Sequence, residues 1–192
     1  MKTLKAAFPI VPVKKFIFPR GTYSIVINNA LYYEQLHDSL LLNKEIGVPF
    51  WFCEDFNVYG CSAKVLSVYQ NEKKGFTRVK VEGLKLFRIT KYSKRNLGNS
   101  LNEADVNILD FEDEKIVNPS IIHYFSKITE TEIYGFNPQI KLLELLNWLN
   151  LRPELSVAVI SRDNQEEREQ LLTRILKFLA VKKSQKSIYQ LN

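Results

Sequence analysis

Two cysteines and two histidines are the residues of this chain that could ligate a metal, or act as nucleophile and base. Cys53 and Cys61 lie eight positions apart, and His37 and His123 lie far from both. A Cys-Cys-His-His zinc site would use all four, but their spacing matches no compact ligand pattern. Reduced thiols that pack as small apolar side chains are the favoured interpretation. We therefore expect no metal ion and no cofactor.

The sequence contains none of the short motifs that mark common catalytic sites. No GxxxxGK[ST], GxGxxG, GxSxG or HExxH pattern is present. His37 precedes Asp38 on a predicted helix, where adjacent side chains do not face each other, so the pair does not predict a triad. The acidic residues Asp110 and Glu112–Glu114 lack the spacing and the glycine of a calcium loop. We expect a non-enzymatic, ATP-independent protein without catalytic residues; a hydrolase site assembled from distant residues is the remote alternative.

Basic residues dominate the middle of the chain. Between Lys64 and Arg95, ten residues are basic and two are acidic, and Tyr69 and Phe76 lie among them. Basic strands with aromatic neighbours can bind single-stranded RNA through phosphate contacts and base stacking. The alternative is a solvated outer face, which the modest net charge of +6 favours. The candidate nucleic-acid contacts are Lys73, Lys74, Arg78, Lys80, Lys85 and Arg88.

Composition indicates a globular protein with a buried core. The chain has 192 residues, of which 45% are apolar and 25% are charged. The aromatic content of 12% favours a strand-rich part. No apolar run approaches the ~20 residues that cross a bilayer, and the proline-broken start does not resemble a signal peptide. We expect a cytoplasmic protein without a membrane partner.

The first part of the chain has the pattern of short strands with tight connections. The polar stretch "QNEKKG" predicts a hairpin loop, and Gly83 predicts a bulge or bend between two strands. The segment from Asn29 to Leu42 predicts a single helix that begins at an asparagine cap. The predicted strands are Tyr23–Ile27, Val48–Cys53, Cys61–Tyr69, Phe76–Val81 and Leu84–Ile89, with 105–111 as a further candidate.

After residue 115 the pattern becomes helical. Asn118-Pro119 and Asn137-Pro138 each place a cap residue before proline at the first helical position, and Pro153 predicts a third start. A longer helix over 164–181 carries acidic residues first and basic residues last. The leucine stripes of these helices indicate a helix-to-helix core or, less favoured, a groove for a partner. The interpretation is an α+β protein with a β-rich unit over 1–115 and a helical bundle over 116–192.

Three stretches of the first part resemble the N-terminal substrate-binding domain of Lon proteases. The opening "FPIVPVKKFIFPRGTYSIVI" is similar to that family's proline-rich start, with "FPRG" as a bend. The stretches around Gly60 and around Gly83 are similar to its "G..a.I" and "v.G..rf.i" strands. The helical segment "EEREQLLTRILKFL" resembles the region that follows in the family. The matching residues are Pro9, Pro12, Phe18, Pro19, Gly21, Ile25, Ile27, Gly60, Ala63, Val65, Val81, Gly83, Leu86, Phe87 and Ile89.

The resemblance implies a PUA-like β-barrel followed by a helical bundle, and a module that binds unfolded or partner polypeptide. A protease system is a further candidate partner, and nucleic acid ranks behind polypeptide. The family's "P.hiFe.rY" block is degraded in "SIVINNALYYEQL", and no ATPase or peptidase segment is present, so we expect a stand-alone binding protein. The candidate polypeptide contacts are Phe16, Phe18, Tyr23, Tyr32, Tyr33, Phe50 and Trp51.

Overall fold

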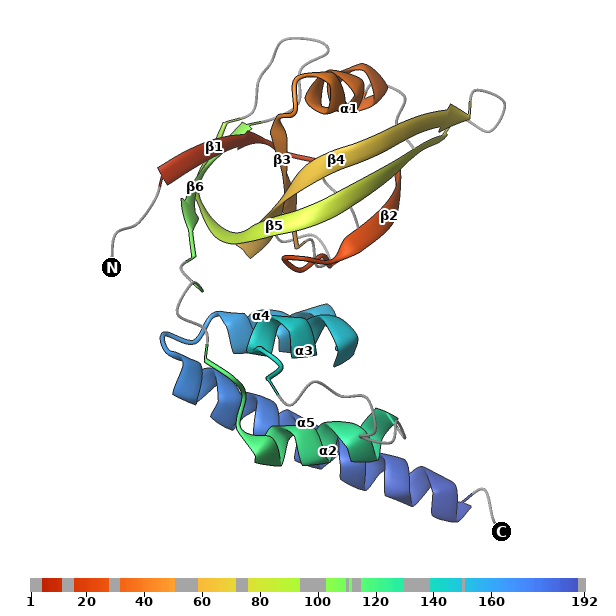
Figure 1. Cartoon of the computed structure of the whole chain (residues 1–192), viewed down its shortest axis with the longest axis vertical. Helices are drawn as coiled ribbons and strands as arrows, with labels where there is room; N and C mark the ends of the chain where they lie inside the picture. Colours follow the sequence, from red (N-terminus) through yellow and green to blue (C-terminus); the bar gives the residue numbers. More distant parts are fainter. Residues whose placement is uncertain are drawn as a thin grey trace. The chain divides into compact units, whose positions relative to one another are not determined.

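The computed structural model combines an antiparallel sheet with helices, as the α+β interpretation predicted (Figure 1). It describes residues 5–11, 16–27, 32–50, 59–71, 76–93, 103–109, 111, 115–129, 139–149 and 151–189, without the side chains of 5, 35, 92, 93 and 184–189. The chain divides into two compact units, Met1–Phe111 and Glu112–Asn192. No helix among these residues is long and apolar enough to cross a membrane.

The first unit is a six-stranded antiparallel sheet with one helix. The sheet order is β1-β6-β5-β4-β3, and β2 pairs with the free side of β5. The helix α1 packs on β4, and Figure 1 shows this helix above β3 and β4. The elements are β1 (Lys5–Pro9), β2 (Thr22–Ile27), α1 (Tyr32–Leu41), β3 (Glu45–Pro49), β4 (Tyr59–Asn71), β5 (Phe76–Ser93) and β6 (Glu103–Ile108).

The long strand β5 organises this sheet. Its first half lies between β4 and β2, with Arg78 in register with Tyr69 on one side and Val26 on the other. Its second half pairs with β6, where Ile89 is opposite Val106. The prediction of two separate strands, Phe76–Val81 and Leu84–Ile89, was therefore wrong. The predicted irregularity at Gly83 is confirmed, because the register with β4 shifts there.

The two edges of the sheet meet at one point. Ile10 and Gly47 form a single parallel bridge, and the Val11 amide donates to the Gly47 carbonyl at 2.9 Å. No ladder of paired residues follows this bridge within the described strands, so the sheet is not closed. A fully closed PUA-like barrel stays a prediction.

The predicted "FPRG" bend is a tight turn that rests on β5. The Gly21 amide donates to the Phe18 carbonyl, and Arg20 has a φ of 66°. Two hydrogen bonds hold the turn against the strand: the Arg20 amide donates to the Gly83 carbonyl at 2.8 Å, and the Gly83 amide donates to the Gly21 carbonyl at 2.9 Å. These hydrogen bonds attach the turn to β5, although the turn itself is not part of a strand.

The second unit contains four helices within its described residues. Pro119 begins the first of them, as predicted, and Asn118 caps it by accepting from the Ser120 amide at 3.0 Å. The helix α5 packs against α2 and α4. The helices are α2 (Pro119–Thr129), α3 (Leu142–Leu149), α4 (Pro153–Ile160) and α5 (Gln165–Tyr189).

The leucine stripes of these helices are buried in part. Leu143 and Leu146 of α3 and Leu172 and Leu176 of α5 are buried, whereas Leu171 is half-buried. The Gln165 side chain accepts from the Lys115 amide at 2.7 Å and donates to the Lys115 carbonyl at 2.9 Å. These bonds fix the start of α5 beside the segment that leads into α2.

One buried hydroxyl group of the sheet gives a stability prediction. Thr77 of β5 is fully buried, and its Oγ1 has no hydrogen-bond partner among the described residues. Replacing Thr77 by valine keeps the shape and removes the unsatisfied hydroxyl, so we expect a gain of about 1 kcal/mol in unfolding free energy. Urea denaturation would measure it. Thr77→Ser keeps the hydroxyl and loses a methyl group, so it should destabilise; a loss of stability in Thr77→Val would contradict the prediction.

Candidate functional site

The phenylalanines proposed as polypeptide contacts form a packed cluster. Phe16 is half-buried and stacks on Phe50 with a centroid distance of 3.6 Å, and its ring lies 4.6 Å from that of Phe18. Phe18 and Phe50 are 5% and 1% exposed. The structure places these two rings in the core of the first unit, where they support the fold.

The tyrosines of the same candidate set are half-buried. The Tyr23 hydroxyl accepts from the Phe18 amide at 2.9 Å, which braces the turn, and burial raises the pKa of this phenol. Tyr32 and Tyr33 begin α1, where the Tyr33 ring lies 5.8 Å from His37. Trp51 lies outside the described residues. The described members of the set do not form one exposed surface, and their binding role stays a prediction.

The basic candidates on β5 are exposed at separate places along the strand. Arg78 and Lys80 lie in the half that pairs with β2, and Lys85 and Arg88 follow after Gly83. Lys73 and Lys74 lie outside the described residues. The structure therefore brings Arg78 and Lys80 together on one outer face.

A neighbouring cross-strand row on the sheet has balanced charge. Lys64 of β4 is in register with Glu45 of β3 and with Glu82 of β5. Opposite charges directly across strands are favourable and lower the local potential. This row therefore lowers the positive potential beside Arg78 and Lys80, while Lys85 and Arg88 are exposed further along β5.

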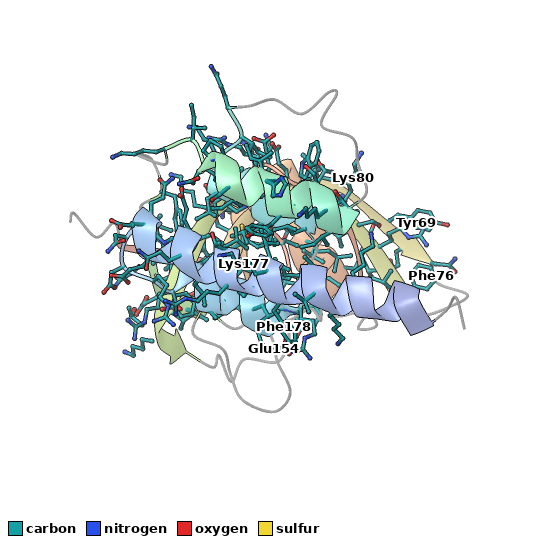
Figure 2. All side chains as sticks on the ribbon, turned by 90° about the horizontal axis from the view of Figure 1, so that it is seen from below. Tyr69, Phe76, Lys80, Glu154, Lys177 and Phe178 are labelled. Carbon is teal, nitrogen blue, oxygen red and sulfur yellow. The ribbon has the colours of Figure 1, made fainter. Side chains whose placement is uncertain are left out.

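The same outer face carries exposed apolar side chains. Val26, Arg78 and Tyr69 form one row across β2, β5 and β4. Val26 and Tyr69 are 52% and 59% exposed, and Figure 2 shows Tyr69 and Phe76 projecting near the far end of the hairpin. We call this surface the ribbon face, and its members are Val26, Leu66, Tyr69, Phe76, Arg78 and Lys80.

Two local features shape the ribbon face. The Arg78 guanidinium carbon lies 5.8 Å from the centroid of the Phe76 ring, within the range of a cation–π contact. Leu66 is the extra residue at the register shift of β4 and is 37% exposed. The face therefore combines aromatic, aliphatic and cationic groups, which suits a chain with apolar side chains and partial negative charge.

The one cysteine among the described residues is poorly placed for covalent chemistry. Cys61 is fully buried, and its thiol donates to the Ser62 carbonyl at 3.2 Å. Burial raises the pKa of this thiol far above its ordinary value, because a thiolate is poorly solvated there. Cys53 lies outside the described residues, and the described ones contain no cluster of three metal-ligating side chains.

The comparisons with known proteins agree with the fold. Residues 7–187 match the family of the ATP-dependent protease La (LON) substrate-binding domain, and the chain belongs to this family. This family membership confirms the resemblance inferred from the sequence. No curated protein shows a significant match to the chain.

Two solved structures are similar in fold. One is a Lon N-terminal domain protein from Xanthomonas campestris, with a TM-score of 0.65, 14% identity, and coverage of 90% of this chain and 98% of that chain. The other is the N-terminal domain of a Mycobacterium avium complex Lon protease, with a TM-score of 0.53, 14% identity, and coverage of 92% and 98%. At this identity the likeness concerns the fold alone.

Proposed function

We propose that this chain is a non-enzymatic module that binds polypeptide on its ribbon face. Membership of a substrate-binding family supports binding of protein substrates in general. The observation that carries the proposal is the row of Val26, Arg78 and Tyr69, in which exposed apolar groups flank a cation. A contiguous exposed apolar patch, unlike a single exposed residue, is typical of surfaces that bind other molecules, and Val26, Leu66 and Tyr69 would form such a patch here.

The proposed ligand is an extended or unfolded segment. Its apolar side chains would lie against Tyr69, Val26 and Leu66, and its carboxylates or carbonyl oxygens would meet Arg78 and Lys80. Aromatic and arginine side chains contribute most to such interfaces.

We also propose a cytoplasmic setting, a PUA-like barrel for the first unit and a helical bundle for the second unit. The bridge between Ile10 and Gly47 supports the barrel.

RNA binding is the second candidate, and a salt titration separates the two. The described part of the ribbon face offers two cations, Arg78 and Lys80. Two phosphate contacts to a single strand would give a salt slope of only about −1.4, a weak electrostatic term. A steep loss of RNA affinity between about 50 and 200 mM salt would favour the RNA alternative.

The prediction for the polypeptide site concerns Tyr69. The probe is a fluorescently labelled unfolded protein whose cysteine thiols are alkylated to neutral thioethers. We expect Tyr69→Ala to weaken its binding about tenfold, as loss of an aromatic contact does. Fluorescence anisotropy measures the affinity. Leu42→Ala is the control, because Leu42 is 61% exposed and lies outside the ribbon face. Equal affinity of Tyr69→Ala and the wild type would place polypeptide binding elsewhere on the chain.

A further inference from the structure

The second unit contains an open cavity between the start of α5 and the turn before it. Its volume is about 270 Å³, and its lining is Arg162, Glu167, Gln170, Leu171 and Arg174. Arg162 belongs to the α4–α5 connection, and the other four residues lie on α5 at helical spacing. The cavity is therefore lined by two arginines that come from different segments.

The two guanidinium groups are available to a ligand. Among the described residues, neither the Arg162 nor the Arg174 side chain has a hydrogen-bond or ion-pair partner. The carboxylate of Glu167 is already engaged, because it accepts from the Asn164 side chain at 2.8 Å. Asn164 in turn accepts from the Glu167 amide at 2.9 Å, which closes a reciprocal cap at the start of α5. The neutral Asn164 amide leaves the charge of Glu167 in place, so the lining of two arginines and one glutamate carries a net charge of +1, which suits a carboxylate.

Two exposed apolar side chains continue from the cavity along α5, on the face that also carries the half-buried Leu171 and the exposed Arg174. Leu171, Arg174, Phe178 and Val181 recur at intervals of three and four residues, so they share one helix face. Phe178 is 66% exposed and Val181 is 58% exposed. We call these residues, together with the exposed Lys182, the α5 stripe.

Acidic residues are absent from the second half of α5, although the neighbouring α4 carries the exposed Glu154. No acidic residue follows Glu169 in the sequence, whereas Arg174, Lys177, Lys182, Lys183 and Lys186 do. Two of the lysines are used within the unit: Lys177 lies 5.5 Å from the Tyr124 ring centroid, and Lys183 donates to the Ile128 carbonyl at 2.8 Å. Figure 2 shows Lys177 on the side of α5 toward α2 and Phe178 on the other side.

We propose that the α5 stripe and the cavity bind an acidic polypeptide segment with an apolar helical face. Its carboxylates would pair with Arg162 and Arg174, and its apolar side chains would cover Phe178 and Val181. The 3-4 spacing of the stripe fits the face of an amphipathic partner helix. Two large apolar side chains are too few for insertion into a lipid surface, which needs a broad apolar face. The charge of the cavity and the form of the stripe therefore favour an acidic peptide.

The test uses the full chain and a synthetic amphipathic peptide that carries glutamates beside an i, i+3, i+4 stripe of leucines. We expect Arg174→Gln and Phe178→Ser each to weaken binding about tenfold. Lys177→Gln is the matched control: it removes the same charge from the same helix on the α2 side, and binding should change less than about twofold. Replacing every glutamate of the peptide by glutamine should abolish most of the binding.

Three results would overturn the proposal. One is equal binding of the glutamate and glutamine peptides, and another is unchanged affinity in Arg174→Gln. The third is binding of anionic vesicles or RNA, but not the peptide, at this surface. Because the ribbon face would also accept apolar and carboxylate groups, the acidic peptide is measured in the Tyr69→Ala background, where a loss of affinity on adding Arg174→Gln reports on the α5 stripe alone. Arg174→Gln by itself should leave the binding of the alkylated unfolded protein unchanged, so the two proposed sites succeed or fail separately.

Discussion

Replacing Gly83 by alanine is expected to destabilise the first unit by about 3 kcal/mol or more, at the upper end of what overpacking costs. A Cβ atom at this position would lie 2.1 Å from the Phe18 carbonyl oxygen and 2.8 Å from the carbonyl carbon. The neighbour is backbone that two hydrogen bonds hold against Gly83, so it cannot move aside as a flexible side chain would. The clash must be relieved by displacing the turn from the strand.

Urea denaturation measures the loss of unfolding free energy, and hydrogen-exchange protection of the β5 amides shows whether the loss is local to this strand. Lys85→Ala is the matched control, because Lys85 is exposed two positions further along the same strand. We expect it to change stability by less than about 0.5 kcal/mol. If Gly83→Ala were as stable as Lys85→Ala, the turn would not rest on β5 as described.

Gly83 also shows which part of the fold local sequence can predict. The glycine correctly indicated an irregularity, since glycine inside a strand pattern marks a bulge or a close backbone approach. The conclusion that it separates two strands was wrong, because β5 continues through it. Glycine is required at this position because the Phe18 carbonyl, 65 positions away in the sequence, lies against it. Local pattern carries no information about such an approach.

The helix starts show the same limit. Asn118-Pro119 begins α2 as predicted, whereas Asn137 and Pro138 lie outside the described residues, and α3 starts at Leu142 within the segment predicted as helix. Lys141 forms a bridge with Ile116, and the Val117 amide donates to the Ile140 carbonyl at 3.1 Å. This pairing between distant segments keeps the chain extended where the local signal favoured helix. Tertiary contacts override a cap signal in this way.

The sequence predicts which side chains of β5 share one face, but it does not predict which residues of other strands lie beside them. The alternation of "FTRVKV" in the sequence is sufficient to place Phe76, Arg78 and Lys80 on one face of a strand. Val26 and Tyr69 join them only through the register of β2 and β4 with β5, which periodicity does not reveal. Phe18 and Phe50 were candidates because they are aromatic, but large apolar side chains near a sheet are most often buried, as these are.

The second large effect is expected at Phe87, whose ring is fully buried and lies 5.9 Å from the Phe8 ring. Two strands approach this ring through glycines. A Cβ at Gly60 would lie 2.4 Å from Phe87 Cζ, and one at Gly47 would lie 3.4 Å from the same atom. The ring therefore occupies space that β4 leaves open by having no side chain at Gly60, whereas a Cβ at Gly47 would only be in ordinary contact with it. Phe87→Ala should cost about 3–5 kcal/mol, whereas Phe87→Leu should cost roughly 1 kcal/mol.

A double-mutant cycle tests whether the glycine and the ring depend on each other. Gly60→Ala alone forces its Cβ against Phe87 and against the Val48 carbonyl oxygen, at 2.7 Å. In the Phe87→Ala background the first clash disappears and the second remains. The double variant should therefore be more stable than the sum of the single losses predicts, by about 1 kcal/mol or more. Strictly additive losses would mean that the Val48 carbonyl, and not the aromatic ring, requires a glycine at position 60.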